Sequence, residues 1–223
     1  EQPRLTSTAE LRSVVYKESK LGDLNVVAQG VADDLDITAD WVYESLAINV
    51  EGQVGIAESV ISGNVRRASV REERAGEWTL ADPFGFSVDG QDIRVDAHDW
   101  SGDNGDVSVT RFSIQGDDVQ ITAALQEMPL QLGAAFLPSN FELLGHANAN
   151  VDIVRRDGSW SGPVDWRQVN TVLRVRETND EFTDVAIPRA EIDALLADGG
   201  MTAQARLEIE PGVLGELDMT LQQ

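Results

Sequence analysis

Cysteine is missing from the 223-residue chain, which excludes disulfide bonds and cysteine-based zinc or iron–sulfur centres. Lysine is scarce as well, since Lys17 and Lys20 are the two lysines among 17 basic residues. Acidic residues number 39, and the formal net charge is −22. Phosphate backbones and anionic membrane surfaces repel such a chain, so we expect no nucleic-acid partner.

Long apolar runs are also missing. No stretch approaches the roughly 20 apolar residues that a membrane-spanning helix needs. The first residues, Glu1–Arg4, lack the basic start and apolar stretch of a signal peptide. We therefore expect residues 1–223 to form a single elongated β-rich segment of a larger protein, with any targeting segment outside this sequence.

What the sequence does contain is alternation of apolar and polar residues with a period of two, which is typical of β-strands. One example is Leu35–Trp41, where apolar residues alternate with Asp34, Asp36, Thr38 and Asp40. The longest example runs from Phe141 to Ile153. Asp-Gly and Gly-Asp pairs separate these runs and supply the positive φ angles that hairpin turns need. The pattern predicts an all-β fold.

Two segments are ambiguous. Residues 126–137 include Pro129 and are followed by Pro138, and they favour a short irregular or helical crossover. Residues 189–197 fit either a helix or a strand, and we favour the strand because the neighbouring segments alternate in the same way.

Signals for catalysis or metal binding are weak. His98 and His146 both fall on the polar phase of the alternation, which favours solvated strand histidines, and no G-x-S-x-G elbow is present. The acidic run Asp99–Asp106 contains oxygen ligands suited to calcium, but its spacing fails the EF-hand template and an acidic hairpin loop explains it better. We expect no enzyme activity, no catalytic residue, no metal and no cofactor.

The alternating face is the remaining candidate site. It forms the core of a closed β-sandwich, or it lines an apolar groove on an open curved sheet, suited to acyl chains. The lining residues that we predict for the groove are Leu35, Ile37, Ala39, Leu46, Ile48, Val50, Ile93, Val95, Val119, Ile121, Leu143, Ala147, Val151, Ile153, Leu207, Ile209 and Met219.

Two passages resemble a known family. The first runs from Glu77-Trp78-Thr79-Leu80-Ala81-Asp82-Pro83-Phe84 through Phe86–Val95 to His98-Asp99-Trp100. The second comprises Leu130-Gln131-Leu132, Phe136-Leu137-Pro138 and Phe141–Ala149. Together, over about residues 77–155, they resemble the TamB-type inner-membrane subunit of the translocation and assembly module, within the AsmA-like, bridge-like lipid transfer proteins. Members often carry a cysteine where Asp99 stands here.

The resemblance implies a strongly curved, open antiparallel sheet that forms a U-shaped trough, or β-taco, with an apolar interior. It implies a periplasmic segment of a Gram-negative protein that is anchored in the inner membrane and bridges to the outer membrane. The implied partners are phospholipid acyl chains and the outer-membrane subunit of the module. The implied role is lipid transport in outer-membrane biogenesis and protein secretion.

Other roles stay open at this stage. A chaperone-like scaffold would capture strands of outer-membrane β-barrel proteins or autotransporters by β-augmentation. A closed sandwich would act as an adhesin or structural module. Unpaired end strands would also favour edge-to-edge self-association of the chain.

Overall fold

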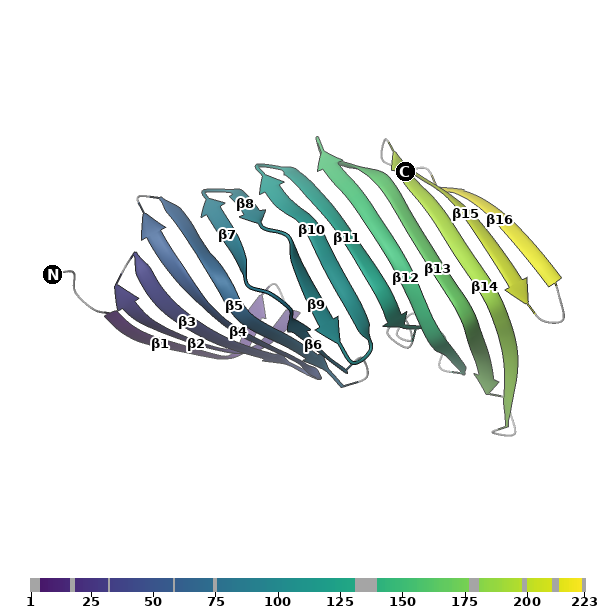
Figure 1. Cartoon of the computed structure of the whole chain (residues 1–223), viewed down its shortest axis with the longest axis horizontal. Coiled ribbons are helices and arrows are strands. Elements are labelled where there is room, and N and C mark those ends of the chain that lie inside the picture. Colours follow the sequence, from purple (N-terminus) through teal and green to yellow (C-terminus); the bar gives the residue numbers. More distant parts are fainter. Residues whose placement is uncertain are drawn as a thin grey trace. The chain divides into compact units, whose positions relative to one another are not determined.

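A computed structural model describes residues 5–16, 19–31, 33–57, 59–73, 76–130, 140–176, 181–197, 200–209 and 213–221. The described residues form sixteen strands, all assigned to one sheet, and every recorded register is antiparallel (Figure 1). The predicted all-β, open antiparallel sheet is therefore confirmed, and a closed sandwich of two sheets is not what the chain forms. The described residues contain no helix that is long and apolar enough to span a membrane.

The chain divides into two compact units, which we describe separately. Unit 1 comprises residues 1–103 and 110–116, and unit 2 comprises residues 104–109 and 117–223. The prediction of a single elongated segment over residues 1–223 stays a prediction.

Unit 1 contains nine strands and the second half of a tenth, joined mainly by short turns. They are β1 (Leu5–Tyr16), β2 (Ser19–Val31), β3 (Asp34–Tyr43), β4 (Leu46–Ala57), β5 (Val60–Glu72), β6 (Gly76–Leu80), β7 (Phe84–Asp89), β8 (Asp92–Val95), β9 (His98–Gly102) and β10 (Gly105–Gln115). Strands β1 to β5 pair in sequence order. Strand β5 then pairs with β6 through one half and with β7 through the other, because β6 and β7 are two parts of one interrupted strand (Figure 1).

Unit 2 contains the first half of β10 and six long strands that pair in sequence order. They are β11 (Asp118–Pro129), β12 (Phe141–Arg156), β13 (Ser159–Arg176), β14 (Phe182–Ala197), β15 (Gly200–Ile209) and β16 (Val213–Leu221). The strand that we favoured for residues 189–197 is confirmed within β14.

The irregular or helical crossover that we expected for residues 126–137 is wrong for its first residues, which belong to a strand. Strand β11 continues to Pro129 beyond a register shift between Leu125 and Met128, where Glu127 has a φ of 52°. The shift lets the strand absorb an extra residue and keep its pairing with β12, as a β-bulge does. Residues 131–137 of the expected crossover lie outside the described residues.

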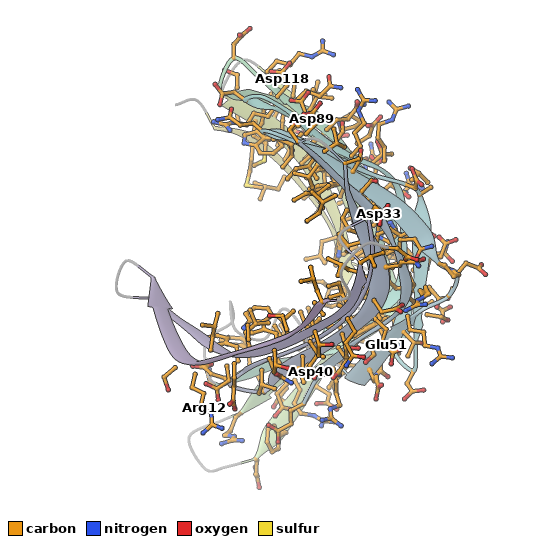
Figure 2. All side chains as sticks on the ribbon, turned by 90° about the vertical axis from the view of Figure 1, so that its left-hand side faces the viewer. Arg12, Asp33, Asp40, Glu51, Asp89 and Asp118 are labelled. Atoms are coloured by element: carbon orange, nitrogen blue, oxygen red, sulfur yellow. The ribbon has the colours of Figure 1, made fainter. Side chains whose placement is uncertain are left out.

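The strands of unit 1 are strongly curved. Figure 2 shows Asp33, Asp40 and Glu51 pointing to the convex side of the ribbon, and Arg12 of β1 lies on that side too. Because side chains alternate between the two faces of a strand, the residues between these charged positions face the concave side.

Candidate functional site: the apolar sheet faces

One face of unit 1 is apolar from strand to strand. Residues that pair across an antiparallel sheet share a face, so the registers trace rows of neighbouring side chains. One such row runs from Leu24 through Trp41, Ile48 and Val70 to Trp78. The same registers place on this face all the lining residues that were predicted in unit 1, namely Leu35, Ile37, Ala39, Leu46, Ile48, Val50, Ile93 and Val95.

Unit 2 has an apolar face of its own. A row from Ala123 through Val151, Val164, Ala194 and Ala203 continues to Met219. The predicted residues of unit 2 share this face, namely Val119, Ile121, Leu143, Ala147, Val151, Ile153, Leu207, Ile209 and Met219. The registers show only that these residues share a face. Their role in lining a groove stays a prediction.

The apolar side chains are half-buried rather than buried. Most predicted lining residues are half-buried, and Met219 is 40% exposed. Among the described apolar residues, those with less than a tenth of their surface exposed include Trp78, Ala147, Ile187 and Ala203. A sheet that packed against a second layer would bury far more of this face. The apolar surface of each unit is therefore partly accessible.

The opposite face is polar and carries ion pairs. In unit 1, Nη2 of Arg66 on β5 lies 2.6 Å from Oδ1 of Asp36 on β3, with β4 between the two strands. In unit 2, Arg189 lies 2.5 Å from Glu191, and Arg174 lies 2.9 Å from Asp184. The hydrogen bond from Arg189 lowers the pKa of Glu191, and the hydrogen bond from Arg174 lowers the pKa of Asp184.

Two open hollows lie mainly on polar residues. One, of about 440 Å³, is lined by residues of β4, β5 and β6 that include Glu51, Arg67 and Glu77. The other, of about 420 Å³, is lined by residues of β13–β16 that include Asp165, Asp193 and Asp218. Within the described ranges no three histidine, cysteine or carboxylate side chains are grouped to hold a metal ion.

A matched interruption of two strands distinguishes unit 1. Strands β6 and β7 are separated at residues 81–83, and β8 and β9 are separated at residues 96–97. Backbone hydrogen bonds still join the two sides of the gap, from Ala81 N to Asp99 O at 2.8 Å and from Asp96 N to Gly85 O at 2.9 Å. Pro83 lacks an N–H group, which is consistent with the missing pairing at this point.

An aromatic cluster follows this interruption on the apolar face. Phe84 pairs with Val65, and Trp100 pairs with Leu80, so both aromatic side chains belong to that face. The ring of His98 stacks on Phe84 with centroids 4.2 Å apart, and it meets Trp100 edge-on at 6.2 Å. His98 is therefore half-buried on the apolar face, and its expected position on the polar phase is wrong.

The error for His98 has a physical cause. The prediction continues the alternation of Ile93, Val95 and Ala97 through residues 96–97, which puts His98 on the polar face. These two residues leave the strand, however, so the phase is reset before β9. His146 behaves as expected: it lies on β12 in the opposite phase to Ala147 and is exposed. The expected acidic hairpin around residues 99–106 is confirmed, because β9 turns into β10 at Asp103–Asn104.

Comparison with known protein families assigns the chain. A family model described as the N-terminal domain of TamB matches residues 1–222. The chain belongs to the TamB family. The match extends on both sides of the passages at residues 77–155 that carry the resemblance. No curated protein and no solved structure matches the chain.

Membership of the TamB family implies a role in the translocation and assembly module and in outer-membrane biogenesis. It implies a periplasmic-facing region of a protein anchored in the inner membrane, with the outer-membrane subunit of the module as partner. The family is a structural and transport module rather than a family of enzymes.

Proposed function

We propose that the apolar faces of this TamB domain carry the acyl chains of phospholipids between the inner and outer membranes. The observation that supports this most directly is the half-exposed apolar face that each unit presents without a covering layer among the described residues. Soluble proteins rarely leave large contiguous apolar patches exposed unless something binds there.

The chemistry of an acyl chain suits such a face. The backbone polar groups of interior strands are already paired within the sheet, so the face offers methyl and aromatic surface with few open hydrogen-bonding groups. An acyl chain needs no hydrogen bonds, and each methylene removed from water contributes roughly 0.8 kcal/mol. Ten methylenes in contact with the face would contribute about 8 kcal/mol before the cost of ordering the chain. Head groups would stay in water at the margins.

A second candidate is a scaffold that captures strands of outer-membrane β-barrel proteins. It rests on β1, which pairs with β2 and with no other described strand. Leu5 and Leu11 of β1 are each 50% exposed on its apolar side. An extended peptide could add to that edge through backbone hydrogen bonds and place alternate side chains on the apolar face.

Site-specific photo-crosslinking in cells tests both candidates. A photoreactive residue at Val151 should label phospholipid, because Val151 lies on the apolar face of β12. The same residue at Asn150 is the matched control, since Asn150 is exposed on the polar face one position away. Ile121, which shares the apolar face with Val151, should repeat the result.

The outcomes separate the candidates. Lipid adducts at Val151 and Ile121, with few at Asn150, support acyl-chain carriage. Protein adducts from the same photoreactive residue placed at Leu11 on the exposed edge of β1, without lipid at Val151 and Ile121, would replace it with strand capture. Native mass spectrometry of the purified chain should also find bound phospholipid, and a lipid-free spectrum together with lipid-free crosslinks would overturn the proposal.

A further inference from the structure

A single arginine breaks the apolar character of unit 2. The registers of β11–β16 place one charged residue on the apolar face within the described ranges, and it is Arg155. It pairs with Val119 on β11 and with Trp160 on β13, one step beyond the pair Ile121–Ile153. Arg155 therefore lies at the end of the apolar face nearest the turn between β12 and β13.

Arg155 has no counterion among the residues that the structure describes. The side chain is half-buried, whereas the neighbouring Arg156 is exposed in the opposite phase. Arg167, Arg174 and Arg206 on the polar face have carboxylates within 4.0 Å, but no ion pair of Arg155 occurs among the described residues. Exposed arginines such as Arg156 lack an ion pair within the described ranges as well, so what sets Arg155 apart is that it is half-buried.

The carboxylates near this end of the sheet form no ion pair with Arg155. Asp118 alternates with Val119 and is exposed in the opposite phase, and Asp157 lies in the β12–β13 turn. A half-buried guanidinium is costly unless an anion accepts its hydrogen bonds. In a chain with 39 acidic residues, a half-buried arginine that forms no ion pair within the described residues suits an external anion.

Trp160 adds a second feature to this end of the face. Its side chain shares the face with Arg155 and is 37% exposed. Tryptophan combines an apolar ring with one N–H donor, so it suits a boundary where an apolar guest meets water. Below Arg155 on β12, the same face continues with Ile153, Val151 and Ala149, spaced about 6.7 Å apart for alternate residues of a strand.

The geometry points to Arg155, with Trp160 beside it, as the binding site for the phosphate of a phospholipid whose acyl chains lie on the apolar face of unit 2. This inference rests on the proposed function and adds the class of head group to it. The planar guanidinium can donate two parallel hydrogen bonds to phosphate oxygens, which a lysine cannot reproduce. The phosphate would stay at the end of the face while the chains extend along β12.

Binding measurements with the 223-residue chain test the inference. The probes are a pyrene-labelled phosphatidylglycerol and a diacylglycerol with the same labelled chains and no phosphate. For the unmodified chain we expect tighter binding of the phospholipid. Arg155→Gln should weaken phospholipid binding about tenfold, the scale of one hydrogen bond to a charged group, and leave diacylglycerol binding unchanged.

Two variants and one competitor complete the test. Arg156→Gln removes an equal charge from the exposed polar phase and should change neither affinity, whereas Arg155→Lys should restore part of the loss. Glycerol phosphate without acyl chains should compete weakly, and strong competition would make Arg155 a site for free phosphate instead.

The remaining outcomes are distinct. Equal binding of both lipids by the unmodified chain, or an equal loss of both in Arg155→Gln, would overturn the head-group site and leave acyl-chain binding standing. Binding of neither lipid would overturn the proposed function and this inference with it.

Discussion

The two units build an apolar face in different ways. Unit 1 includes the short strands β6–β9, of four to six residues, and fills the interruption between them with aromatic side chains such as Trp78, Phe84 and Trp100. Unit 2 uses the unbroken strands β12–β14, of 16 to 18 residues, and a row rich in alanine and valine. A continuous apolar face therefore needs a consistent phase across strands, and it does not need one kind of side chain.

The close contacts differ in the same way. In unit 1, a Cβ added at Gly102 would lie 2.5 Å from Cδ1 of Trp78, so the indole packs directly on the glycine. In unit 2, a Cβ added at Gly145 would lie 2.8 Å from the hydroxyl of Thr171, and Gly145 has a φ of 125°. Each contact requires glycine, but the first anchors an aromatic ring and the second accommodates a polar side chain.

The largest effect that we predict is for Trp78→Ala. Trp78 is 8% exposed, and its removal leaves a cavity beside Gly102 that should cost about 3–5 kcal/mol of unfolding free energy. Trp160→Ala is the matched change in unit 2 and should cost less than about 1 kcal/mol, because Trp160 is 37% exposed. Urea unfolding followed by circular dichroism measures both.

Hydrogen exchange locates the damage. In Trp78→Ala, amides of β5, β6 and β9 should lose protection before those of β12–β14. Equal losses of stability from the two tryptophan changes would show that the packing of Trp78 on Gly102 is no special anchor of unit 1.

A smaller effect of opposite sign is expected for Thr171→Val in unit 2. Thr171 is 2% exposed, and its hydroxyl has no hydrogen-bond partner among the described residues. Valine has nearly the same shape and no polar atom to desolvate, so it should stabilise the chain by about 1 kcal/mol. A rise in the urea midpoint at unchanged slope would confirm this. A fall would mean that the hydroxyl holds a buried water, and Thr171→Ser then serves as the control.

The smallest effect concerns acid stability in unit 2. The hydrogen bond from Arg189 holds the pKa of Glu191 below its ordinary value of 4.5. A lowered folded-state pKa contributes stability above the ordinary value, and this contribution is lost as the pH falls through the lowered pKa. Glu191→Gln should therefore flatten the decline of stability below about pH 4.5, and should change little at pH 7 beyond the loss of one exposed ion pair.

Thermal midpoints between pH 3 and pH 7 measure this effect. Arg189→Gln should flatten the decline as well, because it removes the hydrogen bond that lowers the pKa of Glu191. An unchanged pH profile in both variants would show that this ion pair is fully screened by solvent.

Much of the apolar faces could be predicted from local sequence. The alternation from Phe141 to Ile153 gave the correct face for β12, and extending it by one step would have placed Arg155 on that face. Trp160 could not be placed in the same way, because its position depends on where the β12–β13 turn falls. The groove itself, and edge-to-edge association of the chain, remain predictions.

Sequence alone determined the strand type and the phase of most strands, because a period of two assigns side chains to faces without knowledge of neighbours. Only the tertiary structure decided where that phase is reset, at the gap between β8 and β9, since pairing with the opposite strands fixes which residues leave the sheet. It also decided that the apolar faces stay accessible. Alternation is the same for a face that packs against a second sheet and for one that does not, and the difference depends on contacts between residues far apart in the chain.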